Sequence, residues 1–124
     1  MIKSLSIVAM TFLVGLTPAL AAGDAENGKR VFNKCKACHV ENAEKNRIGP
    51  HLVGLFGRTA GSVENYRYSK AMAESGIVWN EETLDAYLAN PRQYVKGTRM
   101  VFPGLKKASD RDDVIAYLRE VTKP

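Results

Sequence analysis

The sequence predicts a small all-α domain. Near both ends of the chain, apolar residues recur at the spacing that places them on one face of a helix. The two faces comprise Gly28, Val31, Phe32 and Cys35 in the first segment, and Val114, Tyr117, Leu118 and Val121 in the last. No segment shows a convincing strand pattern. Residues 48–61 hold four glycines and a proline, a composition that favours a loop.

Residues that can cap a helix precede each expected helix. Their side chains accept hydrogen bonds from the free backbone N–H groups of the first turn. The expected starts are Asp24, Ser69, Asn80, Asn90-Pro91 and Ser109-Asp110. Gly76 is expected to end the short helix that begins after Ser69. Gly28 lies on the inner face of the first helix and admits a close neighbour, so we expect this helix to cover the apolar face of the last.

The N-terminus has the features of a secretory signal peptide. Lys3 precedes an apolar run over residues 5–16, and Pro18 and the small residues 19–22 follow it. We therefore predict a cleaved leader over residues 1–21, with the cut after Ala21 or Ala22, and one domain over 22–124 in the periplasm. An uncleaved anchor is the alternative, but the run is shorter than the roughly 20 apolar residues that a spanning helix needs.

Removal of the leader changes the charge balance little. Only Lys3 is lost among the charged residues, which leaves 17 Lys and Arg against 13 Asp and Glu. This mild positive excess does not lead us to predict binding to nucleic acid, and we expect contact with a membrane surface to be transient. A chain of about 100 residues can bury one modest core, and we predict a monomer.

Both cysteines of the chain lie in the stretch NKCKACHV, residues 33–40, and His39 directly follows the second. In an oxidising compartment, two such thiols would form a disulfide unless another group claims them. Zinc would need four ligands; the other soft candidates are His39 and His51, and His39 follows Cys38 too closely for the usual paired spacing. A thioredoxin-like pair belongs to a βαβ pattern that is missing here, and a disulfide over so short a loop would stabilise little.

The remaining interpretation of C-x-x-C-H is covalent haem attachment. If residues 28–39 end a helix, Cys35, Cys38 and His39 project from one face, with neighbouring Cβ atoms about 5 to 6 Å apart. Two sulfurs can then bond the two vinyl carbons on one haem edge while the imidazole reaches the iron. A bound haem would also give the long glycine-rich loop a surface to pack on. A chance occurrence of this short motif remains the alternative.

The sixth position of the iron would then need a ligand. Without the leader the chain has two methionines, Met72 and Met100. Met72 lies in the short helix after Ser69, where a methionine usually fills the core. Met100 lies in KGTRMVFPG, a loop between glycines and a proline. A thioether is a suitable soft ligand for haem iron, so we predict Met100 as the ligand.

The order of motifs resembles a known family. The motifs follow one another as in class I c-type cytochromes, close to mitochondrial cytochrome c and its soluble bacterial relatives. They are CKACH, then IGPHLVGLFGR, then Trp79 ahead of NEETLDAYLANPRQY, then GTRMVFPG and finally DDVIAYL. The resemblance covers essentially the whole chain after the leader. It implies an all-α fold around one haem c, with Cys35 and Cys38 as thioether attachments and His39 and Met100 as axial ligands. It also implies that the Pro50 carbonyl accepts a hydrogen bond from His39.

The resemblance assigns roles to further residues. Trp79 and Tyr68 match positions that donate to a haem propionate, and Arg58 matches one that balances its charge; a buried carboxylate needs such donors. The remaining matched positions are near the Met100 sulfur and the haem edge, and they comprise Tyr87, Thr98 and Phe102. His51 matches no ligand position and is expected at the surface. Met72 departs from the family, which commonly has a polar residue there.

The function implied is a soluble periplasmic electron carrier and not an enzyme, because two protein ligands leave the iron no open position. Its partners would be membrane complexes: a cytochrome bc-type donor and a terminal oxidase or photosynthetic reaction centre as acceptor. We expect docking through basic residues near the haem edge, Lys34, Lys36, Lys96, Arg99, Lys106 and Lys107. The alternatives are a haem enzyme or sensor with a weak Met100 bond, and a thiol protein without haem.

Overall fold

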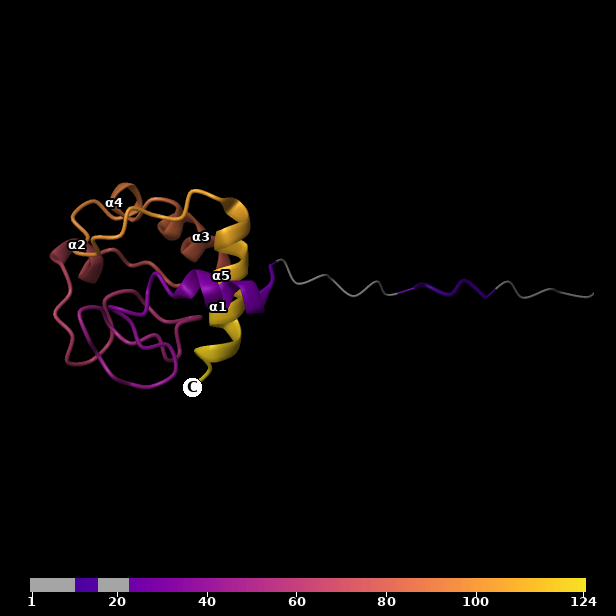
Figure 1. The fold of residues 1–124 in the computed structure, drawn as a ribbon, viewed down its shortest axis with the longest axis horizontal. Helices are drawn as coiled ribbons and strands as arrows, with labels where there is room; N and C mark the ends of the chain where they lie inside the picture. Colours follow the sequence, from indigo (N-terminus) through magenta and orange to yellow (C-terminus); the bar gives the residue numbers. More distant parts are fainter. Residues whose placement is uncertain (1–10, 16–22) are drawn as a thin grey trace, which may run out of the picture.

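The structure is a computed structural model that describes residues 11–15 and 23–124. Its helices are α1 (Ala25–Phe32), α2 (Lys70–Ala73), α3 (Glu81–Ala89), α4 (Pro91–Tyr94) and α5 (Ala108–Val121) (Figure 1). Within those residues the only β-type pairing is an isolated antiparallel bridge between Thr59 and Val78. The all-α prediction is confirmed.

Helices α1 and α5 pack together, as the Gly28 position predicts (Figure 1). A Cβ atom on Gly28 would overlap the Asp113 carbonyl and the Tyr117 side chain, so this contact requires glycine. The ring centroids of Phe32 and Tyr117 lie 5.6 Å apart in the same interface. The two ends of the domain are thereby joined through one tightly packed helix pair.

Asp113 fixes the start of α1 against α5. Its carboxylate accepts from the Asp24 backbone N–H at 2.7 Å and from the Asn27 side-chain amide at 2.6 Å. These two hydrogen bonds hold the pKa of Asp113 below its usual value. Asp24 in turn caps α1 by accepting from the Glu26 and Asn27 N–H groups, which confirms the predicted helix start.

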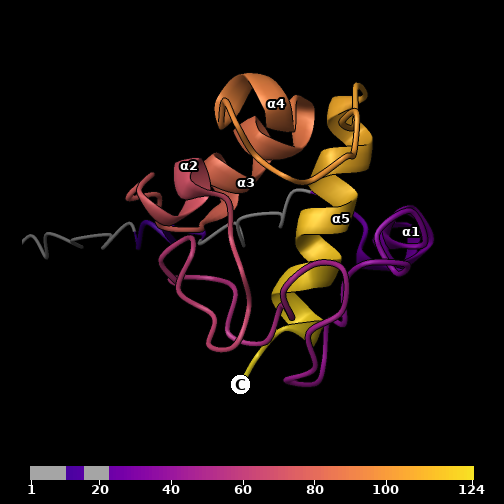
Figure 2. The same cartoon turned by 90° about the vertical axis from the view of Figure 1, so that its left-hand side faces the viewer.

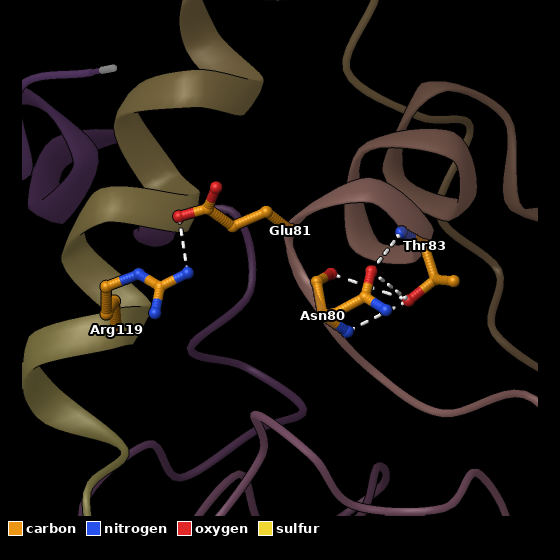
Figure 3. Close-up of polar contacts among 4 residues, drawn as sticks. All are labelled: Asn80, Glu81, Thr83 and Arg119. Atoms are coloured by element: carbon orange, nitrogen blue, oxygen red, sulfur yellow. Dashed lines mark hydrogen bonds and ion pairs between the residues drawn. The ribbon is translucent and has the colours of Figure 1, made fainter. Parts of the chain in front are cut away.

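Helix α3 begins with a capping box (Figure 3). The Asn80 side chain accepts from the Thr83 N–H at 2.9 Å, and the Thr83 hydroxyl accepts from the Asn80 N–H at 2.9 Å. Next to this cap, Glu81 forms an ion pair with Arg119 of α5 (Figure 3). One helical turn farther along, Asp85 pairs with Arg111 at 2.7 Å. The two ion pairs hold α3 against α5.

Helix α5 begins one residue earlier than predicted, at Ala108 instead of at Ser109-Asp110. Its N-cap is Lys107, whose side chain makes no capping hydrogen bond. The sequence signal was misleading because a serine and an aspartate, which favour caps, lie here inside the first turn. The buried face of α5 is also wider than the predicted stripe and includes Ile115, since α1 and α3 both pack on this helix.

Residues 33–69 contain no helix and form the long loops on one side of α5 (Figures 1 and 2). They pass through turns and meet α2 at Ser69, whose hydroxyl caps that helix by accepting from the Met72 N–H at 3.1 Å. The buried core joins α1, α3 and α5 to these loops through the side chains of Phe32, Leu84 and Val114 on the helices and Leu55 in the loops. The loop prediction for residues 48–61 is confirmed.

The predicted leader falls largely on residues 1–10 and 16–22, which lie outside the described residues. Of residues 11–15, the side chains of Phe12, Leu13 and Val14 are more than four-fifths exposed. Among the described residues, no helix combines the length and the apolar character needed to cross a membrane.

Candidate haem-binding site

Cys35 and Cys38 lie in a tight turn directly after α1. The helix ends at Phe32, earlier than residue 39, because the backbone hydrogen bonds change from the i−4 to the i−3 pattern. The Cys35 N–H donates to the Phe32 carbonyl at 2.8 Å, and the Cys38 and His39 N–H groups both donate to the Cys35 carbonyl. The turn thus keeps the two cysteines and His39 within one compact loop, although it is not helical.

Both cysteines are free thiols and are partly buried. Burial, followed by the nearby Cys38 sulfur, raises the pKa of Cys35 to about 11. At neutral pH the Cys35 sulfur of the free chain is therefore a protonated thiol. The described residues also contain no group of three or more His, Cys, Asp or Glu side chains arranged to hold a metal ion.

His39 is oriented by the backbone that follows it. Its ring Nδ1 lies 2.7 Å from the Pro50 carbonyl oxygen, which can only accept, so Nδ1 carries the proton. Burial lowers the pKa of His39, which keeps the ring neutral at neutral pH. The Nε2 lone pair is then available to a metal. Gly49 packs on the same ring, where any Cβ atom would overlap the imidazole.

The two methionines differ as the sequence predicts. Met72 is 8% exposed and is part of the buried core. Met100 lies outside any helix, in the segment between α4 and α5, and is partly buried against that core. The difference leaves Met100 as the thioether that is carried on a loop at the edge of the core.

Tyr87 and Thr98 contact Met100, as the resemblance implies. The Tyr87 hydroxyl lies 3.8 Å from the Met100 sulfur and 3.0 Å from the Thr98 hydroxyl oxygen. Thr98 Oγ1 also accepts from the Met100 N–H at 3.4 Å. Burial raises the pKa of Tyr87, so its phenol stays protonated and can donate. These contacts fix both the backbone and the sulfur of Met100.

Three residues assigned to a haem propionate lie close together. The Trp79 backbone N–H donates to the Arg58 carbonyl at 2.9 Å, and burial raises the pKa of the Tyr68 phenol, an effect that the nearby Arg58 cation partly offsets. Arg58 Nη1 also donates to the His51 and Val53 carbonyls at 3.0 Å each. Burial lowers the pKa of Arg58, although it remains a cation at neutral pH. Their roles toward a propionate stay predictions.

Phe102 and His51, the two other residues singled out from the sequence, are both partly exposed. Phe102 is half-buried against the core, two residues after Met100, where an aromatic side chain can cover a haem edge. His51 keeps part of its side chain exposed, in keeping with its expected place at the surface. Its Nδ1 accepts from the Val53 N–H at 3.2 Å, and burial lowers its pKa.

The donor set fits a covalently attached haem. Two free thiols can add to the vinyl groups, a neutral imidazole has its Nε2 available, and a thioether lies at the boundary of the core. Cys35, Leu52, Tyr68, Met100 and Phe102 all pack as partly buried residues against one cluster. The site thus combines sulfur, nitrogen and apolar contacts, which a haem requires.

The sequence did not reveal every residue that shapes the site. Gly49 is one such residue, and its only local signal was its place in the IGP stretch, residues 48–50. Asn46 and Tyr66 are two others, because each bonds to the backbone around Pro50. No sequence spacing indicated those contacts.

The fold and the site together define a class I c-type cytochrome. The family model described as cytochrome c matches residues 25–122. A cytochrome c from Gibberella zeae is 52% identical over 106 residues, covering 84% of this chain and all of that protein. A cytochrome c from Arabidopsis thaliana is 50% identical over 103 residues, which is 82% of this chain and 92% of that protein.

A solved structure agrees with the sequence relatives. Cytochrome cH from Methylobacterium extorquens matches with a TM-score of 0.74 at 46% identity, covering 78% of this chain and 98% of that one. The chain belongs to the cytochrome c family and is an electron carrier. The resemblance read from the sequence is thereby confirmed.

Proposed function

We propose that this protein is a periplasmic one-electron carrier with one covalent haem c, attached through Cys35 and Cys38 and ligated by His39 and Met100. The observation that carries the proposal is the 2.7 Å contact between His39 Nδ1 and the Pro50 carbonyl. This contact directs the proton to Nδ1 and leaves Nε2 for the iron, next to two free thiols.

When bound, the haem supplies the reversible gain and loss of one electron. The protein's own residues set the conditions for it. His39, held by Pro50, and Met100, held by Tyr87 and Thr98, would occupy both axial positions, so that no site remains for a substrate and the protein is not an enzyme. A soft thioether in low-dielectric surroundings favours the ferrous state, which places the reduction potential at the high end of the haem range.

The periplasmic location is supported by the N-terminal sequence. Lys3, the apolar run and the small residues 19–22 follow the order of a secretory leader. Osmotic shock should therefore release the haem protein from the cell with a new N-terminus near Gly23. Retention of the complete chain in the cytoplasm would contradict this location.

We further propose a cytochrome bc-type complex as donor, and a terminal oxidase or photosynthetic reaction centre as acceptor. The exposed cations Lys34, Lys36, Lys96, Arg99, Lys106 and Lys107 lie on the segments that carry the cysteines, Met100 and Phe102. Of the acids, Glu81 and Asp85 are paired with arginines of α5. Such a distribution supports brief docking of the basic segments on an acidic surface.

Charge reversal tests this docking model. Exposed charges act over roughly a Debye length, about 8 Å at physiological salt, so they affect encounter more than the haem itself. Replacing Lys34, Lys36 or Lys107 by Glu should slow electron transfer to an acidic membrane partner several-fold while leaving the reduction potential nearly unchanged. Stopped-flow kinetics at increasing ionic strength should show a falling wild-type rate and a flatter dependence for the variants.

Lys123 provides the control, because it is exposed beyond the end of α5 and lies outside the basic segments. Lys123→Glu changes the net charge by the same amount as Lys34→Glu. It should leave the rate close to wild type. Equal slowing by both variants would show that net charge alone matters, and it would remove the case for a localised docking face.

A further inference from the structure

The carbonyl that orients His39 belongs to a segment held on both sides. Within residues 48–51, the Gly49 N–H donates to the Cys38 carbonyl at 2.8 Å, and the Gly49 carbonyl accepts from the Arg47 N–H at 2.9 Å. On the far side, the His51 carbonyl accepts from Arg58. These contacts leave the Pro50 carbonyl directed at the His39 ring.

The side chains of Asn46 and Tyr66 also hold this segment, and we call these two side chains the bracket. The Tyr66 hydroxyl donates to the Ile48 carbonyl at 2.7 Å, and Asn46 Oδ1 accepts from the His51 N–H at 3.0 Å. Pro50 lies between these two attachment points, because Ile48 is two residues before it and His51 is one residue after it. The direction of its carbonyl therefore depends on both.

Asn46 and Tyr66 also join two loops. Asn46 Nδ2 donates to the Glu64 carbonyl at 3.0 Å, and Tyr66 packs edge-on against Tyr68 with ring centroids 4.7 Å apart. Between Glu64 and Tyr66, Asn65 has a φ of 60°, a left-handed conformation that asparagine adopts more readily than most residues. The turn at Asn65 thus anchors the loop of Pro50 to the loop of Tyr68.

We propose that Asn46 and Tyr66 are positioning residues that fix the Pro50 carbonyl and thereby set the strength of its hydrogen bond with His39. This inference rests on the proposed ligation of iron by His39. A firmly held acceptor pulls electron density from Nδ1–H into the ring and makes Nε2 a stronger donor. A stronger donor favours ferric iron. Loosening the bracket should therefore weaken the hydrogen bond and raise the reduction potential.

The test uses haem-loaded protein carrying Asn46→Ala or Tyr66→Phe. Asn46→Ala removes both contacts of that side chain, whereas Tyr66→Phe removes only the hydroxyl and keeps the ring packing on Tyr68. NMR can follow the exchange of the His39 Nδ1 proton with solvent in the reduced protein. Each variant should exchange this proton about tenfold faster than wild type, because each loses at least one hydrogen bond that resists local opening. Each should also have a higher reduction potential.

Three control variants separate an effect on the Pro50 carbonyl from a general loss of protein stability. Ser62→Ala removes a hydrogen bond to Thr59 in the same region, and Asn80→Ala removes the cap of α3; neither side chain is hydrogen-bonded to residues 48–51. Both should leave the exchange rate and the potential near wild type. Asn46→Asp keeps an acceptor for the His51 N–H and should restore slow exchange relative to Asn46→Ala.

Two results would overturn the inference. One is an exchange rate and potential that stay at the wild-type values in both Asn46→Ala and Tyr66→Phe. The other is equally fast exchange in Asn80→Ala, which would assign the effect to global stability. A wild-type protein that binds no haem would instead overturn the proposed function, and the spectrum of that protein alone distinguishes this case.

Discussion

A protein carrying Cys35→Ala and Cys38→Ala together is expected to lose its haem completely in acid and organic solvent. The wild-type protein should keep its haem through the same extraction, because thioether bonds do not depend on the folded state. The two cysteines are the only ones in the chain, so no other thiol can replace them. Absorbance of the separated polypeptide and solvent phases measures the outcome directly.

The single variants are the controls for this result. Cys35→Ala and Cys38→Ala each keep one sulfur in the turn after α1, and each should retain haem through one thioether bond. Retention by the double variant would place the attachment elsewhere. Release from the wild-type protein would contradict covalent attachment altogether, and the two sulfurs would then need another explanation.

Replacing Met100 by Ala should change the iron site more than any other single substitution outside the C-x-x-C-H motif. The reduction potential should fall by about 0.1 V or more, since axial ligands set haem potentials over a range of about 0.8 V. The far-red band of the thioether bond to ferric iron should vanish. Cyanide and peroxide should reach the iron at least about tenfold faster, because one axial position is then open.

Met72→Ala is the matched control, since it removes the same side chain from the buried core. It should lower the free energy of unfolding by about 2 to 5 kcal/mol, as the loss of a buried methionine does elsewhere. The far-red band should remain. If Met72→Ala abolishes the band and Met100→Ala keeps it, the assignment of the ligand is wrong. Fast cyanide binding by the wild-type protein would favour the enzyme or sensor alternative.

The sequence predicted those parts of the fold that depend on neighbouring residues. Asp24 and Asn80 cap helices because their side chains reach N–H groups two or three residues away. Gly28 marked the close approach of α1 to α5, since only a missing side chain permits that contact. The C-x-x-C-H motif is equally local, because its spacing alone places three reactive groups in one turn.

Features that depend on distant contacts were not predicted, or were predicted less accurately. The end of α1 at Phe32 follows from the turn that carries the cysteines, and helical periodicity does not reveal it. Helix α5 starts at Ala108 after an extended Lys107 whose side chain makes no capping hydrogen bond, so no capping residue marks the start in the sequence. The bracket formed by Asn46 and Tyr66 joins residues from two loops, and neither residue type signals such a role in sequence.

An optical redox titration of the purified wild-type protein tests the central claim most directly. The account predicts a haem spectrum that follows a single one-electron Nernst curve at high potential. The far-red band should be present in the oxidised form and disappear in step with reduction. A protein without a haem spectrum, or one whose oxidised form lacks this band, would contradict a carrier ligated by His39 and Met100.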